Sequence, residues 1–265
     1  MPMVRAIRML NAIEAGTTSG AQLETLLGDS GRLAEFNVLL DMRGQARRIA
    51  SATTTMTAIA ASSTAMTAVA ASSAAMTAVG ANDQALRIFM LAGTDQVFSD
   101  FADVAAVIAS STAMTAIAAS STAMTAVVES STAMTAVIAS STAKMVIFNS
   151  DTALAAISAS STALNAMRTA AQYNLYGGTT GTISGPNSSG SYIVVGLSSA
   201  NGTNGTVTIN TKRSGSAVGN VVTADLPRAS DGKTYDVAIP VVSPFSVANS
   251  GPGYTWFIGM LRCDV

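Results

Sequence analysis

A ten-residue repeat occupies the centre of this 265-residue chain and restricts its fold more than any other feature. The heptapeptide Ser-Ser-Thr-Ala-Met-Thr-Ala occurs unchanged at 62–68, 110–116, 120–126 and 130–136, and weaker copies follow as far as residue 166. Each decad carries one Met and, three residues later, one Val or Ile among Ala, Ser and Thr. Near-identical units with two large apolar side chains each predict a repetitive structure instead of an ordinary globular core.

The repeat has the composition of a helix. Alanine and methionine favour helices, and proline is absent between residues 3 and 185. Strict alternation of apolar and polar residues, which would indicate a half-buried strand, is also absent. The Met, the Val or Ile and the next Ser divide ten residues into three turns, about 3.33 residues per turn against about 3.6 in a relaxed helix. Hydroxyl groups that bond the carbonyl four residues earlier can bend a helix and soften this mismatch.

Two large side chains per decad are too few for a thick core but enough for a seam between parallel helices. We therefore predict that 51–172 forms a long α-helical, trimeric, coiled-coil-like shaft, roughly 180 Å long if it is continuous. A disordered Ala/Ser/Thr linker is the alternative, and the fixed Met and Val positions argue against it. The predicted trimer seam consists of Met66, Val69, Met76, Val79, Met114, Ile117, Met124, Val127, Met134, Val137, Leu154, Ile157 and Leu164.

The repeat is interrupted at 80–104, where bulkier residues such as Phe89 and Phe98 replace the Met and Val pattern. Gly93 followed by Thr94 is typical of a helix end next to a helix start. The segment is either a knob on the shaft or a reversal that folds the shaft into a hairpin.

The two ends of the chain differ from the repeat. Residues 1–50 contain three amphipathic segments, 4–15, 17–27 and 32–48, which predict a helical foot. Fifty residues are marginal for an independent core, so we expect oligomerisation or docking to something larger to stabilise this foot.

The C-terminal part is predicted to be rich in strands. A Gly/Ser-rich neck at 173–190 precedes a head at 191–265, for which we expect a small antiparallel β-sandwich. The dipeptide Asn204-Gly205 indicates a hairpin turn. Its expected strands cover 192–197, 207–211, 218–223, 235–242 and 254–261. The predicted fold class is therefore α+β fibrous, with a helical foot, a coiled-coil-like shaft and a β head.

Composition argues against several function classes. The chain has no histidine, one cysteine (Cys263) and a net charge of −1, so we expect no enzyme, no metal site, no cofactor and no nucleic-acid partner. The N-terminus lacks a secretory signal. The uncharged stretches 51–82 and 104–128 are long enough to cross a bilayer, but their many hydroxyls and missing flanking Lys/Arg clusters argue against a membrane span.

The head offers candidate ligand-binding residues. Tyr254 and Trp256 alternate onto one face of a predicted strand, where aromatic rings can stack on a sugar. The alternative is that Trp256 belongs to the core of the head. Asn201, Asn204 and Asn249 lie in Gly/Ser/Asn-rich loops of the kind that often carry recognition.

The sequence resembles tail-fibre-like proteins of tailed bacteriophages. The foot motif Ala-Gly-Thr-Thr-Ser-Gly-Ala-Gln-Leu-Glu-Thr-Leu-Leu-Gly-Asp (15–29), with Arg-Leu-Ala-Glu-Phe-Asn (32–37) and Met-Arg-Gly-Gln-Ala-Arg (42–47), is similar to their N-terminal part. The decads resemble their shaft repeats, so the resemblance covers about 1–170. It implies a homotrimer whose foot docks on the virion. The residues expected to attach it are Leu26, Leu33, Phe36, Arg43 and Arg47.

We therefore expect a non-enzymatic fibre made in the host cytoplasm and located in the virion. By the resemblance, 1–50 attaches to the tail or baseplate, and the head binds a host-surface glycan or protein. A head or collar fibre with a purely structural role is the alternative, and an ice-binding Thr/Ala repeat protein is a remoter one.

Overall fold

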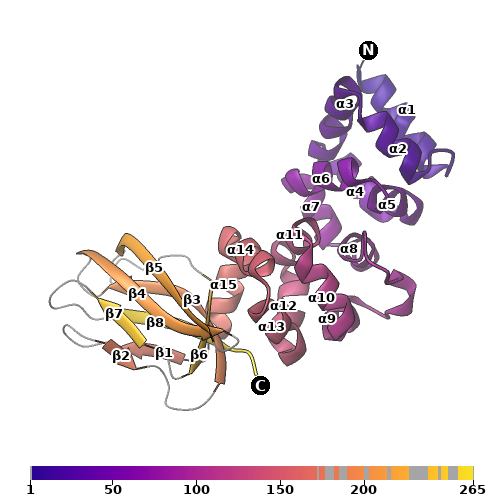
Figure 1. The fold of residues 1–265 in the computed structure, drawn as a ribbon. Helices are drawn as coiled ribbons and strands as arrows, with labels where there is room; N and C mark the ends of the chain where they lie inside the picture. The colour runs from indigo at the N-terminus through magenta and orange to yellow at the C-terminus, as the bar shows by residue number, and fades with distance from the viewer. Residues whose placement is uncertain are drawn as a thin grey trace. The chain divides into compact units, whose positions relative to one another are not determined.

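The computed structural model describes residues 2–171, 173–176, 182–184, 190–199, 203–213, 216–226, 238–243, 246–249 and 256–264. Contacts divide the chain into two units, 1–136 and 137–265, which are described in turn. The first unit is built of short helices, and the second combines helices with two β-sheets (Figure 1).

The helices of the first unit fall into two runs separated by a loop. The first run comprises α1 (Pro2–Glu14), α2 (Gly20–Leu27), α3 (Ser30–Asp41), α4 (Arg43–Ser51), α5 (Thr53–Ala60), α6 (Ser63–Ala71), α7 (Ser73–Gly80) and α8 (Asp83–Met90). A single 3-10 turn, η1 (Phe98–Asp100), lies in the loop. The second run comprises α9 (Val104–Ala109), α10 (Ser111–Ala119), α11 (Ser121–Glu129) and α12 (Ser131–Ala139), the last of which continues into the second unit.

Each decad forms one helix because its first serine acts as an N-cap. Ser62 has extended backbone (φ −125°, ψ 114°), and its hydroxyl accepts a hydrogen bond from the Ala65 amide at 3.1 Å. Its carbonyl accepts from the Met66 amide at 2.9 Å, which starts α6. The helix ends when the Ser72 amide bonds the Val69 carbonyl at 3.1 Å, and Ser72 then caps α7 in the same way. One extended serine therefore separates α6 from α7, and likewise α10 from α11 and α11 from α12.

This break changes the direction of the chain sharply. The axes of α10 and α11 bend by 109° at Ser120. In the first run α2 packs against α5, α3 against α6, α4 against α7 and α5 against α8, so from α2 onward each helix contacts the one three places later. The first run therefore winds as a stack with three helices per turn, and it includes helices from both the predicted foot and the predicted shaft.

The Met and the Val or Ile that recur in each decad form the core between the helices. All of the residues expected to form a trimer seam, from Met66 to Leu164, are 6% exposed or less within the single chain. The alanine before each Met is also buried, for example Ala65 and Ala123. Thr67, Thr77, Thr115 and Thr135 are exposed and Thr125 is half-buried, and the hydroxyl of each donates to the carbonyl four residues earlier.

The predicted fold class was therefore wrong in its central element, because the decads form many short helices and no long coiled-coil shaft. The physical reason is the mismatch of ten residues in three turns. A capping serine removes that mismatch by ending the helix in every decad. The apolar positions then meet the neighbouring helices of the same chain.

The interruption begins later than 80. Asn82 caps α8 through Oδ1, which accepts from Ala85 at 2.9 Å, and Leu86 and Phe89 occupy the buried Met and Val positions. Gly93 has a positive φ of 72°, but no helix begins at Thr94, since α9 starts only after the cap Asp103. Beyond the loop α11 packs against α6, α7 and α8, so the second run folds back onto the first.

The second unit contains the remaining helices, α13 (Ser141–Phe148), α14 (Asp151–Ala159) and α15 (Ser161–Ala170), and eight described strands. The strands are β1 (Tyr173–Tyr176), β2 (Thr182–Ser184), β3 (Gly190–Ser199), β4 (Thr203–Arg213), β5 (Ser216–Leu226), β6 (Ile239–Ser243), β7 (Ser246–Asn249) and β8 (Trp256–Arg262). The predicted neck thus contributes two of these strands.

The strands form two antiparallel four-stranded sheets, ordered β1-β8-β3-β6 and β2-β7-β4-β5. Helices α13 and α15 pack on β3, and α15 also packs on β8. The sequence predicted a hairpin turn at Asn204-Gly205, but both residues lie inside β4, opposite Asp225 and Ala224. That prediction was wrong because the long β4–β5 ladder carries the chain straight through the dipeptide.

No single helix in the described ranges is long and apolar enough to cross a membrane. Two consecutive helix pairs reach that length and hydropathy only when each pair is taken together across its bend.

Candidate functional site

The residues predicted to attach the chain to a virion have different surroundings. Phe36 is fully buried in the first unit, so its prediction as a contact residue was wrong: it occupies the Val position of its helix and belongs to the core. Leu26 and Leu33 are half-buried and line shallow cavities. Arg43 and Arg47 are exposed, four residues apart on α4.

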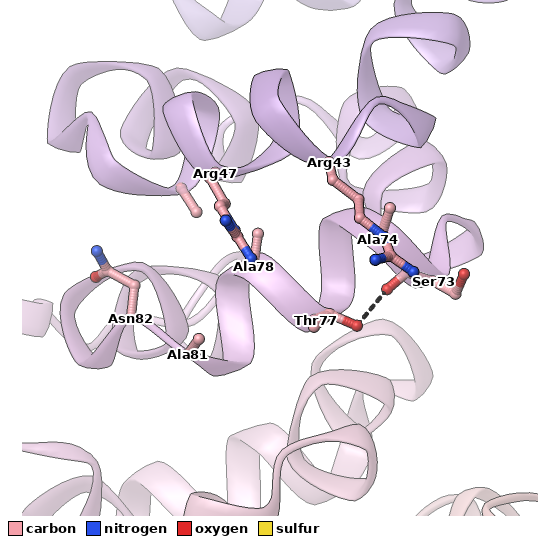
Figure 2. Close-up of a pocket in the computed structure, with 9 residues that line it drawn as sticks. Arg43, Arg47, Ser73, Ala74, Thr77, Ala78, Ala81 and Asn82 are labelled. Atoms are coloured by element: carbon pink, nitrogen blue, oxygen red, sulfur yellow. Dashed lines mark hydrogen bonds between the residues drawn. The ribbon is translucent and has the colours of Figure 1, made fainter.

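These two arginines line one wall of a cavity of about 530 Å³, which we call the α4–α7 groove. Figure 2 shows both side chains reaching from α4 toward α7, Arg43 near Ser73 and Ala74 and Arg47 near Ala78. The groove is lined by Arg43, Arg47, Ala50, Ser73, Ala74, Thr77, Ala78, Ala81 and Asn82.

The polar groups of the α4–α7 groove are chiefly donors. No acidic residue lines it, and among the described residues neither Arg43 nor Arg47 has an ion pair. The Thr77 hydroxyl donates to the Ser73 carbonyl at 2.7 Å, and the Asn82 side chain uses its oxygen to cap α8. The Asn82 amide nitrogen, the Ser73 hydroxyl and two guanidinium groups can therefore meet an anion.

Several other arginines of the same unit, though not Arg8, pair with nearby carboxylates. Arg5 lies 2.7 Å and Arg32 3.4 Å from the carboxylate of Glu35, which is itself buried. Arg48 pairs with Glu14. Among the described residues no acidic side chain pairs with Arg43 or Arg47, and none pairs with Arg8 either. The two groove arginines differ from Arg8 because they lie together along one cavity.

Acidic residues of the first helices instead hold the N-termini of decad helices. The carboxylate of Glu24 on α2 accepts from the hydroxyls of Ser62, Ser63 and Thr64 and from the Thr64 amide. These hydrogen bonds, led by that from Ser62, lower the pKa of Glu24 to about 2. Asp41 on α3 accepts from Ser72 at 2.8 Å in a similar way.

The loop between the two runs is fixed by one charged pair. Arg87 contacts Asp83 at 2.8 Å and donates to the carbonyl oxygens of Phe98 and Phe101 at 3.1 and 2.6 Å. The other carboxylate oxygen of Asp83 accepts from the Val104 amide at 2.9 Å, at the start of α9. These groups are satisfied within the chain and therefore serve the fold.

The predicted ligand residues of the head are only partly described. Tyr254 and Asn201 lie outside the described residues. Trp256 lies in β8, opposite Ser199, whereas Asn204 and Asn249 lie in β4 and β7 of the other sheet. The backbone therefore places the two asparagines on neighbouring strands and Trp256 in a different sheet.

Within the described ranges, no group of three His, Cys, Asp or Glu side chains is arranged to hold a metal ion. Cys263 is buried, and this burial raises the pKa of its thiol to about 12.

No family model matches the sequence, and no curated protein matches it. The groove residues of α7 were missed by sequence reasoning, which treated foot and repeat as separate parts. The signal that could have found them is the stack itself: with three ten-residue helices per turn, α4 meets residues about thirty positions later, namely Ser73 and Thr77.

Proposed function

We propose that this chain is a non-enzymatic, fibre-type structural protein of a tailed-bacteriophage virion. Its N-terminal helices attach it to the tail or baseplate, and its C-terminal strands contact the host surface. The observation that carries the proposal is the α4–α7 groove, where two unbalanced cations lie on the segment that resembles phage fibre feet.

The helical array suits a spacer between two functional ends. Each decad buries its Met and Val inside the chain, as Met114 and Ile117 do in α10, and exposes small hydroxyls such as Thr115. The exposed side of each decad therefore carries mainly small side chains, as in a structural array.

The homotrimer expected by resemblance stays a prediction. Its seam would have to use surfaces other than the decad Met and Val side chains, because those are buried within one chain. The exposed apolar residues of the first helices, Val4, Val38 and Met42, are 44%, 48% and 42% exposed and are available for contacts between chains.

The proposal is tested on purified tailed particles from a culture that carries this gene. Mass spectrometry of the particles should detect the chain, and immunogold labelling with antibodies to the full-length protein should mark tail appendages. Label confined to the head or collar would overturn the tail assignment. Absence of the chain from intact particles would overturn the virion role altogether.

A second arm separates anchoring from adhesion. Particles made with Arg43→Glu and Arg47→Glu should lose the chain, whereas those with Arg8→Glu should keep it, since Arg8 is an exposed cation on α1 outside the groove. Trp256→Ala should leave the chain on the particle and reduce adsorption to host cells. Normal adsorption of particles that lack the chain would contradict the host-binding role.

A further inference from the structure

We propose that the α4–α7 groove is a carboxylate-binding site that receives an acidic segment of a partner protein. This inference rests on the proposed function and deepens it by naming the chemistry of the anchoring partner. Arg43 and Arg47 would each bind one carboxylate of the segment. Ser73 and Asn82, which line the same groove, would donate further hydrogen bonds to the segment.

The spacing of the two arginines suits two carboxylates of one segment. Residues four apart lie one above the other on a helix, with Cβ atoms about 5–6 Å apart. A guanidinium group presents paired N–H donors that match the two oxygens of a carboxylate. Figure 2 shows the two guanidinium groups at different points along α7, so the groove offers two separate charged positions.

The groove is built into the packing of the stack. On α4, Ala46, Ile49 and Ala50 are 1%, 2% and 4% exposed, and α4 packs directly against α7. The facing residues Ala74, Ala78 and Ala81 have small side chains and leave the space between the two helices open. A ligand would therefore enter a space held by the fold, at a low cost in ordering protein side chains other than the arginines themselves.

Charge favours an acidic protein segment over a nucleic acid. The whole chain carries a net charge of −1, and the cavity between α3 and α6, about 500 Å³ in volume, is lined by Asp41. A long polyanion needs a row of phosphate contacts to bind well. Two cations in one groove with an acidic neighbouring cavity suit a short segment that carries a few Asp or Glu residues.

The test uses the full-length protein and a fluorescein-labelled hexaglutamate peptide, with binding followed by fluorescence anisotropy. The double variant Arg43→Gln with Arg47→Gln should weaken peptide binding about tenfold or more, as expected for the loss of two charged contacts. Arg8→Gln removes an equally exposed cation elsewhere and should leave binding unchanged. Added salt should weaken binding to the wild type and hardly affect the double variant.

Thr77→Glu provides a variant that keeps both arginines. Thr77 is exposed on α7 and lines the groove, so a glutamate there would supply a carboxylate within the chain and compete with the peptide. Peptide binding should fall while circular dichroism stays that of the wild type. Unchanged peptide binding in both groove variants would overturn the proposal.

A labelled single-stranded oligonucleotide is measured in parallel. Oligonucleotide binding as tight as peptide binding, and lost with the same arginines, would overturn the acidic-segment assignment in favour of a general polyanion site. This assay needs no virion, so it is independent of the proposed function. Loss of peptide binding in a variant that still enters particles would support the site and contradict its role in anchoring.

Discussion

Replacing one decad methionine tests whether the repeat packs within a single chain. Met124 on α11 is 0% exposed, and α11 contacts α6, α7 and α8. Met124→Ala removes the free energy gained by burying the Met side chain away from water, about 1.5–3 kcal/mol. It also leaves a cavity that costs about 1 kcal/mol more after the surrounding side chains have partly relaxed into it. We therefore expect the free energy of unfolding to fall by about 3 kcal/mol.

The assay is urea unfolding followed by circular dichroism, repeated at two protein concentrations about a hundredfold apart. A core within one chain makes the variant less stable than the wild type by the same amount at both concentrations. Thr115→Ala is the control in an identical heptapeptide, because Thr115 is exposed and its replacement should change stability by about 0.5 kcal/mol or less. A Met124→Ala variant as stable as the control would refute the reasoning.

Three other substitutions test the local devices of the fold. Ser120→Ala should cost about 1 kcal/mol in urea unfolding, because the hydroxyl that caps α11 is lost, whereas Ser121→Ala should be nearly neutral; equal costs would contradict the cap. Gly20→Ala should lower the free energy of unfolding by about 1–3 kcal/mol. The reason is that a Cβ at residue 20 would lie 2.3 Å from the Ala61 Cβ and 2.9 Å from the Ala58 carbonyl oxygen. A variant with wild-type stability would disprove that close approach. The hydrogen bonds of Glu24 lower its pKa to about 2, so the carboxylate stabilises the fold above its ordinary pKa near 4.5 and this stabilisation is lost as the pH falls toward 2. Glu24→Gln should therefore flatten this part of the curve of unfolding free energy against pH. An unchanged curve would argue against the hydrogen bonds of Glu24.

The sequence predicted the helical state of the decads and the residues that form their core, but not where that core lies. Ala-rich decads with Met and Val at fixed spacing indicate a helix with one apolar stripe, whether the partner is another chain or the next helix. The deciding residue is the serine, whose hydroxyl competes with the helix and caps the next one. The spacing of the repeat alone does not distinguish a serine that caps a helix from a serine inside a continuous helix.

The foot was predicted as helical but divided wrongly. A single helix was expected at 32–48, and the structure has two, because Met42 takes an extended conformation between α3 and α4. The caps at Met42 and Ala52 continue the ten-residue spacing of the serine caps, so α4 and α5 belong to the same stack as the repeat. Its lack of Ser-Ser-Thr-Ala motifs hid this continuity in the sequence.

The candidate site could be predicted in part. Arg43 and Arg47 were identified from the resemblance, and both line the groove. Phe36 lies in the same resembling segment, but its apolar ring is buried in the core. Ser73 and Thr77 look like any other repeat hydroxyls, and only the stacking of helices three places apart brings them to the arginines.

The most direct test of the account is the backbone conformation of the capping serines in solution. NMR chemical shifts of the full-length protein report helical or extended backbone residue by residue. We predict extended values at Ser72, Ser120 and Ser130, each between residues with helical values, as their φ and ψ angles require. Uninterrupted helical shifts from 110 to 139 would contradict the account and restore a continuous helical shaft.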